Sequence, residues 1–576
     1  MNNKKLFLRV NTVVLSTFCL FLAGCNKSEP ESASKAESSK TEEQSQVISS
    51  SNNPSSVIPP EETYHIVRPS FTPDYDNYGI GAEPSGFNMT YYSDAYSRGF
   101  SWLTDLTAEQ TELYIVQSDK GEQADFSAAD YIEGTSLEIE IKKDGTFTAK
   151  DGSIPSKKGS GSNEVDLNLY SHKVHVENLE KGKAYSYKVG SEAGYIYGAF
   201  IVEKDHAKDI TAVHMSDAQT KDISKTNIWR NTFVKGVETA GEGLDMALYN
   251  GDQFDQNSST NSAGKPARFL RHTKAIDVIW DYKFDIPYMA SSGNHEPSVA
   301  YANYLTGDIN YAAFDEAGCY YSYDVDYAHF VVLNTNTIDD AQINWLKEDL
   351  EEARNAKWKV VMMHISPYST GDHCQSKSST PHDSIVEKFT PIFSEYHVDL
   401  VLQAHDHTYN KTLPYRWDAA GYTTNAHDNE VVNMSPSKKT VDGVEFDDNP
   451  EGTYYVTTGA AGHRYGAGEE DGIWAECVLE NGEIKGLNPS KTFTDISKTK
   501  YAIEVGELTQ ENQYEPYTHG GYTSDQHYEI GDPASGNVNA PMFGVLNLTE
   551  ETMSYHVYTA LGDDVKLFDT LDVYKN

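Results

Sequence analysis

Between about residues 80 and 205, apolar and polar residues alternate along short segments that turn residues separate. Among these segments are TELYIVQS, SLEIEIKKDGTFTAKDG, SHKVHVEN and AYSYKVGS. In an extended strand, this alternation collects the apolar side chains on one face. Several such strands in a row are typical of an antiparallel β-sandwich. We therefore predict an all-β sandwich domain at residues 63–205.

Leu179 and Tyr185 lie within the segment LEKGKAY of this region. Their spacing resembles the tyrosine corner of fibronectin type III-like domains, in which the phenol forms a hydrogen bond with the backbone. The resemblance implies a fibronectin type III-like sandwich in which Tyr185 has a packing role.

Beyond residue 205 the pattern changes to longer apolar runs that alternate with helical segments. The runs are DITAVHM, DMALYN, IPYMAS, HFVVLNTN, KVVMMH and DLVLQAH. Between two of them, the segment DDAQINWLKEDLEEARNAK places Ile343, Leu346, Leu350 and Ala353 on one helical face. Strands that alternate with helices predict an α/β layered domain, which we assign to residues 206–576.

A polar side chain stands at the carboxyl end of nearly every apolar run. These residues are Asp217, Asp252, Asn294, His364, and His405 with His407. Ligands of open α/β sheets bind beyond the carboxyl ends of the strands, so residues dispersed along the chain can converge there. His405 and His407 are one residue apart, and in an extended segment both rings project from the same face.

Each of these residues also has an ordinary structural interpretation. An aspartate can cap the following segment, Asn294 can belong to a turn, and His364 can be a hydrogen-bonded core histidine. The whole set fits metal binding better, because carboxylate, amide and imidazole groups at successive strand ends are suitable ligands for a pair of transition metals.

The N-terminus predicts export. Basic residues precede a short apolar stretch at residues 13–22, which is typical of a secretory signal and too short for a membrane span. The sequence LAGC that follows resembles a bacterial lipobox, so we expect cleavage before Cys25 and lipid attachment to it. An ordinary signal peptide is the alternative.

Residues 1–24 are then the lipoprotein signal peptide, and the Ser/Glu-rich residues 25–62 form a disordered tether. This organisation places the folded part outside the cytoplasm, where it is held at the bacterial cell membrane by the lipid alone.

The charge of the chain argues against one class of partner. The 576 residues carry a formal net charge of −41 and contain no block of Lys and Arg. Such a protein repels a long polyanion, so we expect no long nucleic acid partner. The cysteines outside the leader are Cys319, Cys374 and Cys477, which allow one disulfide or none.

Five short motifs carry a resemblance to a known family. SDAQ, NGDQF, SGNHE, VMMH and AHDH occur in this order and resemble the motif blocks of the calcineurin-like metallophosphoesterases. The stretches AHDHTYNKTLPY and TGAAG, the N-terminal sandwich and the closing strands near GVLNLTEETMSYHVY are similar to the purple acid phosphatase-like branch. The resemblance implies an α/β fold, with a metallophosphoesterase β-sandwich flanked by helices in βαβ units.

The resemblance also implies a role for each motif residue. The ligands would be Asp217 and His407 for the first metal, Asn294, His364 and His405 for the second, and Asp252 as the bridge. His295 would contact the phosphoryl group and help to protonate the leaving alkoxide. His373 would be the substrate-loop histidine, with an exposed loop histidine as the alternative.

The sequence departs from the purple pattern at the first metal. Asp255 stands where a tyrosine would bind ferric iron, and Gln219 stands where many metallophosphoesterases have histidine. We expect the amide oxygen of Gln219 to complete the shell of the first metal, and the protein to lack a strong purple colour. The implied cofactors are two divalent or mixed-valence transition metal ions, namely Fe, Zn or Mn.

The expected function is hydrolysis of small phosphate monoesters by a secreted, lipid-anchored acid phosphatase-like enzyme, through attack of a metal-bound hydroxide. A phosphodiesterase or nucleotidase on the same scaffold is the alternative among enzymes. A surface-binding lipoprotein with a degenerate metal site is the alternative from another class.

Overall fold

The computed structural model describes residues 64–66, 68, 80–141, 147–149, 167–202, 209–220, 223–253, 277–296, 306–313, 319–368, 382–407, 409–417, 430–432, 436–462, 477–480, 483–487 and 541–576. All of them belong to one compact unit, Thr63–Asn576. The predicted signal, lipobox and tether lie outside the described residues and stay predictions. Within the described ranges, no helix is long and apolar enough to cross a membrane.

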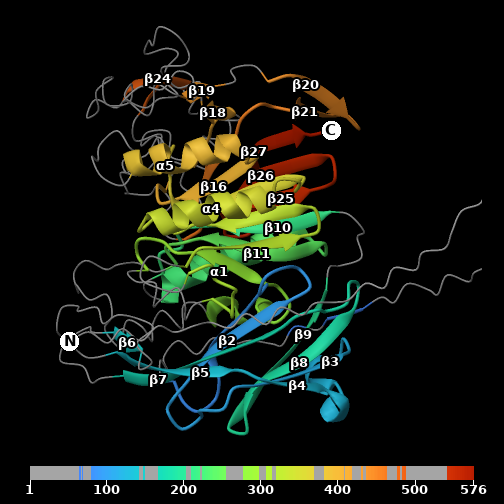
Figure 1. Cartoon of the computed structure of the whole chain (residues 1–576). Coiled ribbons are helices and arrows are strands. Elements are labelled where there is room, and N and C mark those ends of the chain that lie inside the picture. The colour runs from blue at the N-terminus through green and yellow to red at the C-terminus, as the bar shows by residue number, and fades with distance from the viewer. Residues whose placement is uncertain are drawn as a thin grey trace, which may run out of the picture. The chain divides into compact units, whose positions relative to one another are not determined.

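The described strands between residues 85 and 201 form two antiparallel sheets around a shared apolar core (Figure 1). The first sheet has the order β1 (Ser85–Thr90), β2 (Arg98–Thr104), β7 (Leu167–Val176), β5 (Thr135–Ile141) and β6 (Phe147–Ala149). The second has the order β4 (Asp130–Glu133), β3 (Glu112–Gln117), β8 (Ala184–Ser191) and β9 (Gly194–Ile201). Phe87 and Trp102 from the first sheet pack with Tyr187 and Phe200 from the second. The alternating pattern therefore predicted β2, β3, β5, β6, β7 and β8 correctly, but it did not single out β1, β4 and β9. The likeness to fibronectin type III-like domains stays a prediction.

The predicted bond between the phenol of Tyr185 and the backbone is confirmed. Tyr185 lies in β8, and its hydroxyl accepts a hydrogen bond of 3.1 Å from the backbone N–H of Glu180. Leu179 is buried beside it in the sandwich core. The bond fixes the connection that leads into β8.

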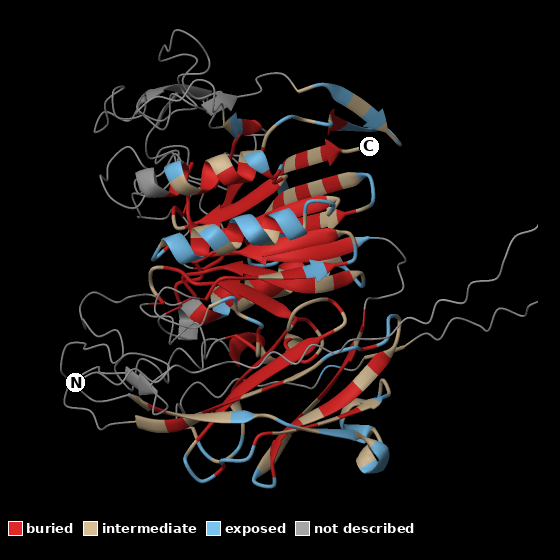
Figure 2. Cartoon of the chain, in the orientation of Figure 1, coloured by how far each residue is buried: buried red, intermediate tan, exposed pale blue. Residues whose placement is uncertain are grey.

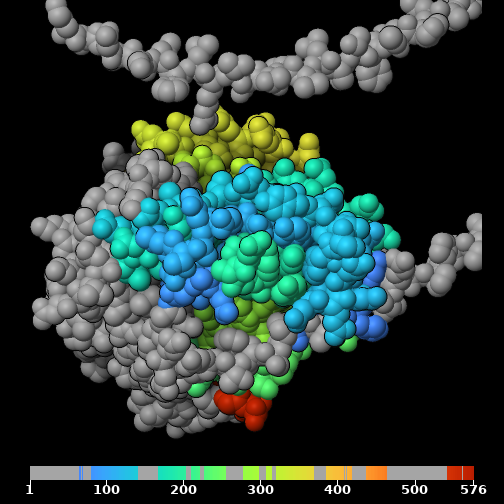
Figure 3. All heavy atoms as spheres, turned by 90° about the horizontal axis from the view of Figure 1, so that it is seen from below, coloured from blue at the N-terminus to red at the C-terminus, as the bar shows by residue number. Residues whose placement is uncertain are grey.

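The outer face of the second sheet carries a row of large side chains. Tyr131, Tyr114, Lys188 and Tyr197 are direct partners across the four strands. The ammonium of Lys188 lies 4.1 Å from the ring centre of Tyr114 and 4.3 Å from that of Tyr195, so cation–π attraction joins neighbouring strands. Figure 3 looks onto this end of the molecule, where the blue to green surface belongs to the sandwich strands.

The region after residue 209 is built on two mixed sheets. The eight-stranded sheet has the order β12 (Tyr288–Ser291), β11 (Leu244–Asn250), β10 (Ile210–Met215), β25 (Met542–Leu548), β26 (Thr552–Leu561), β27 (Asp564–Tyr574), β21 (Val444–Asp448) and β20 (Lys438–Val441). The six-stranded sheet has the order β13 (Tyr321–Val325), β14 (Ala328–Val332), β15 (Trp358–Ile365), β16 (Leu400–Ala404), β22 (Tyr454–Thr458) and β17 (Tyr409–Lys411). The strands β10, β11 and β12 run parallel to one another, as do β14, β15, β16 and β22.

Helices cover the outer faces of these two sheets, and a large core lies between the sheets. The inner core joins residues such as Met246 and Leu546 of the first sheet with Phe330 and Leu402 of the second. Helix α1 (Ile223–Ala240) packs on the eight-stranded sheet, and α4 (Asp340–Glu352) and α5 (His382–Glu395) pack on the six-stranded sheet. Figure 2 shows the central strands of the two sheets buried and the outer side of α4 exposed. The predicted α/β layered architecture is therefore present.

Helix α4 corresponds to the helix expected from the segment after residue 338. It begins after Asp339, whose carboxylate accepts a hydrogen bond from the backbone N–H of Gln342, as an N-cap residue does. Leu346 and Leu350 are buried and Ile343 packs partly buried against the same core, as the pattern predicted. The helix ends before Ala353, one residue short of the predicted face.

The sandwich is joined to the layered region by specific contacts. The hydroxyl of Tyr187 donates to the carbonyl of Phe284 at 3.0 Å, and Phe284 itself belongs to the sandwich core. On the other side, Ser101 donates to the carbonyl of Thr306 at 2.6 Å. These contacts hold the sandwich against the segments on either side of residues 288–296, where the predicted metal ligand Asn294 lies.

Candidate metal centre

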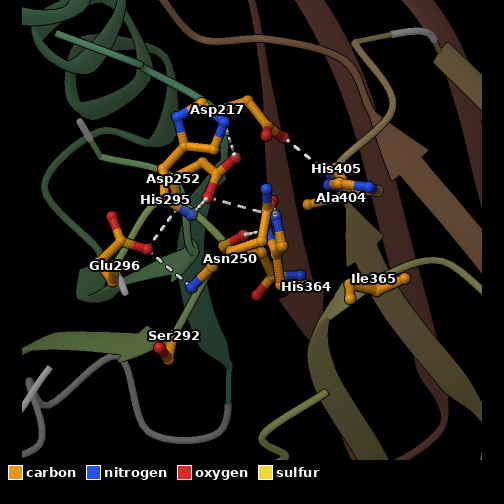
Figure 4. A network of polar contacts seen from close by, with 12 residues as sticks. Asp217, Asn250, Asp252, Ser292, His295, Glu296, His364, Ile365, Ala404 and His405 are labelled. Carbon is orange, nitrogen blue, oxygen red and sulfur yellow. Dashed lines mark hydrogen bonds and ion pairs between the residues drawn. The ribbon is translucent and has the colours of Figure 1, made fainter. Parts of the chain in front are cut away.

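The residues singled out at the strand ends converge on one edge of the two sheets (Figure 4). Asp217 follows β10, Asp252 follows β11 and Asn294 follows β12, all from the eight-stranded sheet. His364 is near the end of β15, and His405 directly follows β16, both from the six-stranded sheet. The site therefore lies where the carboxyl ends of parallel strands from both sheets meet.

The backbone at this edge is held in an unusual conformation. The φ angles of Asp217, Gln219, Asp252 and His405 are 52°, 42°, 54° and 75°, in the left-handed region that side chains other than glycine rarely adopt. The loops after β10 and β11 support each other, because the N–H groups of Asp217 and Gln219 donate to the carbonyls of Gly251 and Asp252. Strain of this kind is retained where a site needs a particular side-chain direction.

Two glycines allow the loops to approach closely. A side chain at Gly251, whose φ is +76°, would lie 2.8 Å from Nδ1 of His364, and one at Gly293 would lie 2.2 Å from Oδ1 of Asp252. The motif NGD therefore requires glycine for space and for backbone conformation, and the motif SGN requires it for space.

His364 is fully buried and its orientation is fixed from both ring nitrogens. Nδ1 donates to the carbonyl of Asn250 at 2.7 Å, so Nε2 is the nitrogen that remains for a metal ion. Nε2 faces Oδ1 of Asn294 at 2.9 Å and Oδ1 of Asp252 at 3.4 Å. Loss of the proton from Nε2 would give the tautomer that a metal ligand requires.

Three of these side chains form a ready ligand set. One ligand atom each from Asp252, His364 and His405 lies within 4.8 Å of the other two. Carboxylate and imidazole groups at such separations can share one transition metal ion. The structure thus brings together the predicted bridge and two predicted ligands of the second metal, with Asn294 beside them.

Asp217 and His407 form the other side of the site. Oδ1 of Asp217 lies 3.6 Å from Nε2 of His407, and both residues are buried. Within the described part of the chain, this oxygen accepts no hydrogen bond. A buried carboxylate oxygen needs positive charge or a donor beside it, so this oxygen fits a cation held between the two residues.

The side chain of Gln219 lies beside Asp252, the residue that is predicted to bridge the two metal ions. Its amide nitrogen is placed 3.2 Å from Oδ2 of Asp252, as a hydrogen-bond donor. The sequence predicted that the amide oxygen would complete the shell of the first metal. In this arrangement the amide group instead hydrogen-bonds the predicted bridging carboxylate, and the role of Gln219 as a ligand stays a prediction. Asp255 and His373 lie outside the described residues.

His295 stands at the exposed side of the site. Its backbone N–H donates to Oδ1 of Asp252 at 2.7 Å, and its ring Nε2 lies 3.8 Å from Oδ2 of the same carboxylate. Its side chain is 15% exposed, whereas that of Asp252 is 1% exposed. The ring is therefore placed between the buried carboxylate and the solvent.

Glu296 is a site residue that the sequence analysis did not single out. Its buried carboxylate accepts hydrogen bonds from the backbone N–H groups of Asp252, Gln253 and Gly293, at 2.8, 2.8 and 2.7 Å. It thus clamps the loop after β11 to the loop after β12. The only signal in the sequence was its place directly after His295, since nothing local reveals contacts with residues some 40 positions away.

The electrostatics of the site show how closely its groups interact. Burial alone would raise the pKa of Asp252, but the imidazoles of His364 and His295 outweigh burial and hold that pKa below its usual range. Burial would lower the pKa of His364, but the Asp252 carboxylate raises it to about 10. Burial and then the charge of Asp252 raise the pKa of Glu296 to about 7. Asp252 is therefore stabilised by positive charge, which a metal ion would also supply.

Comparison with known proteins connects this geometry to a family. Residues 211–409, which include all of the converging residues, match the calcineurin-like phosphoesterase family. Acid phosphatase type 7 of Mus musculus is 26% identical over 325 residues, which cover 51% of this chain and 64% of that protein. The Homo sapiens protein of the same name is 26% identical over 357 residues, which cover 56% and 69%. The matches thus span about two thirds of these relatives.

A solved structure extends the likeness to most of the chain. The purple acid phosphatase PPD1 from yellow lupin (Lupinus luteus) aligns with 86% of this chain and 75% of its own, with a TM-score of 0.55 and 13% identity. At this identity the likeness concerns the fold, which is a mixed, sheet-rich α/β fold of the metallophosphoesterase kind. The family match and the acid phosphatase relatives support a metal-dependent phosphoesterase.

Proposed function

We propose that the calcineurin-like phosphoesterase domain at residues 211–409 makes this chain a dinuclear metallophosphatase that hydrolyses small phosphate monoesters. The observation that carries the proposal is the convergence of carboxylate, amide and imidazole groups from five strand ends on one edge. A merely structural cluster would not need four residues in left-handed backbone conformation at the same place.

The side chains divide into two ligand groups around one carboxylate. Asp217 and His407 would hold one metal ion, and Asn294, His364 and His405 would hold the other. Asp252 lies between the groups and would bind both ions. When bound, such a pair lowers the pKa of water and stabilises charge on the attacking and leaving oxygens of a phosphate ester.

His295 would act on the leaving group. In the reaction, water attacks phosphorus, the bond from phosphorus to the ester oxygen breaks, and the departing alkoxide needs a proton. The partly exposed ring of His295 beside Asp252 is placed to hold that proton and transfer it. Asp252 and its neighbours meanwhile keep the ring at the entrance of the site.

The location of the enzyme belongs to the proposal as well. The N-terminal charge and apolar pattern and the LAGC sequence support a lipid-anchored protein outside the cytoplasm. In that location the partner would be a small phosphate ester, and the lipid would be the sole attachment to the membrane.

The test combines metal analysis with turnover. We expect the purified chain without its leader to bind two metal ions and to hydrolyse p-nitrophenyl phosphate. Asp252→Ala and His405→Ala should each abolish turnover and lower the metal content, because one removes the shared ligand and the other opens the shell of the second ion. Turnover of a diester panel decides between monoesterase and diesterase. Less than one bound metal ion per chain with no turnover would instead favour a binding lipoprotein.

A further inference from the structure

Asn250, the last residue of β11, joins three strands that carry candidate ligands. Its backbone carbonyl accepts the hydrogen bond from Nδ1 of His364, which lies on β15 in the opposite sheet. Its side-chain amide donates to the carbonyl of Leu402 on β16 at 2.7 Å. Asn250 is fully buried, and Asp252 follows it by two residues. Asn250 therefore connects the two sheets next to the candidate ligands Asp252 and His364.

The first consequence concerns the ring of His364. A histidine binds a metal through one nitrogen only when the other carries the proton, and the group that accepts that proton decides which nitrogen is which. Here the acceptor is the carbonyl of Asn250, so the position of that carbonyl sets the direction of Nε2. Nothing in the side chain of His364 alone would do so.

The second consequence concerns β16. Leu402 precedes His405 by three residues on the strand that leads into the pair of histidines. The amide of Asn250 holds this strand against the end of β11, from which Asp252 projects. A shift of β16 relative to β11 would move the ligand atoms of His405 and Asp252 apart, and these atoms now lie within 4.8 Å of each other.

We infer that Asn250 is a positioning residue for the metal centre: its side-chain amide holds β16, which leads to His405, against the end of β11, whose carbonyl at Asn250 orients His364, and it contacts neither a metal ion nor substrate. The inference rests on the proposed function, since it concerns the same site. Groups that orient metal ligands from behind commonly change metal affinity by 10- to 100-fold when they are removed. The glycine that follows Asn250 agrees with this role, because it lets the His364 ring pack directly against the loop.

The experiment measures metal affinity separately from stability. Asn250→Leu fills a similar volume but has no hydrogen-bond donor. Asn250→Ser keeps a donor on a shorter side chain and serves as the second variant if Asn250→Leu fails to fold. The matched control is Asn88→Ala, since Asn88 is also fully buried and its amide also donates to a backbone carbonyl, that of Gly86 at 3.1 Å, but in the sandwich. Each protein is stripped with a chelator and titrated with Zn²⁺ and with Mn²⁺, and its thermal unfolding is recorded without metal.

We expect all variants to unfold at lower temperature than the wild type without metal. The dissociation constant for metal should rise by about tenfold or more in Asn250→Leu, rise less in Asn250→Ser, and stay unchanged in Asn88→Ala. The visible spectrum of the Co²⁺-loaded protein should change only in the Asn250 variants. Metal affinity within twofold of the wild type in both Asn250 variants, or an equal loss in Asn88→Ala, would overturn the inference. If the wild type itself bound no metal, the proposed function would fail instead.

Discussion

Asp252 and Glu296 are two neighbouring buried carboxylates from different loops, yet their surroundings give them different properties. Asp252 faces the imidazoles of His364 and His295, which hold its pKa low. Glu296 faces backbone N–H groups, and burial raises its pKa to about 7. The first is placed to bind positive charge, and the second is placed to shape the loops that carry the ligands.

Glu296→Gln should therefore loosen the site without removing a ligand. Both carboxylate oxygens of Glu296 accept hydrogen bonds, whereas a glutamine amide has only one oxygen acceptor. At least one of the three backbone N–H groups therefore loses its acceptor, at a cost of about 1 to 3 kcal/mol. We expect a lower unfolding free energy in urea and weaker metal binding. The exposed Glu348 on α4 offers a control, because Glu348→Gln should change stability by less than about 0.5 kcal/mol. Equal stability of the two variants would show that the clamp is unimportant.

His295→Ala tests the proton-transfer role at the same scale. The ring is assigned to the leaving group rather than to metal binding, so the variant should keep its metal content. We expect kcat to fall by about 10²- to 10⁴-fold for an alkyl phosphate, and by less for p-nitrophenyl phosphate, whose leaving group needs no proton. Loss of metal, or an equal loss for both substrates, would contradict this role.

At the scale of elements, β14 and α4 are joined by a charged cluster that contains none of the candidate metal ligands. His329 of β14 is buried, with Nδ1 2.7 Å from Asp324 and Nε2 2.9 Å from Asp349. Burial would lower the pKa of His329, but the two carboxylates outweigh it and raise the pKa to about 9. The imidazolium therefore holds the helix to the strand.

This cluster predicts a pH dependence of stability. The folded-state pKa lies above the usual value of about 6.5, so the contribution is complete below pH 6.5 and is lost as pH rises through 9. Allowing for the exposure of Asp324, we expect a loss of about 2 kcal/mol between these limits. Urea unfolding of the metal-free protein at pH 6 and pH 9.5 measures it. His329→Gln should remove this part of the pH dependence, and an unchanged difference between the two pH values would refute the assignment.

At the scale of the whole molecule, the C-terminal strands complete the fold. Residues 541–576 form β25, β26 and β27, and β25 pairs antiparallel with β10, the strand that leads to Asp217. The side chain of Lys575 also reaches Asp399, at the start of β16, at 2.8 Å. The end of the chain thus supports strands from both sheets of the site.

The prediction at this scale concerns location. If Cys25 is lipidated, Cys25→Ser should release the protein from the membrane fraction or leave an unprocessed precursor, while activity per folded molecule stays the same. Fractionation of cells followed by immunoblotting measures both outcomes. Unchanged membrane association together with normal signal cleavage would contradict the lipobox interpretation.

The sequence by itself indicated six strands of the sandwich, the strands β10, β11, β12, β14, β15 and β16, and the polar residues near the carboxyl ends of most of them. Periodicity is a local property, and a polar residue that ends a buried strand is visible without knowing the partner strands. For the same reason, the buried face of α4 could be predicted, whereas the hydrogen bond of Tyr185 was expected from the resemblance to the tyrosine corner. His405 and His407 indicated a metal only together with the other residues at strand ends. The expected extended geometry of this pair is wrong, because β16 ends at Ala404 and His405 has a φ of 75°.

Only the tertiary structure decided how those strand ends are held together. The contacts of Glu296 with Asp252, of Asn250 with His364 and Leu402, and of β25 with β10 join residues that are distant in the chain. Such contacts depend on sheet order and on the register between sheets, which no local pattern encodes. The amide of Gln219 illustrates the limit, because its contact with Asp252 could not be read from the sequence, while its predicted role as a metal ligand stays a prediction.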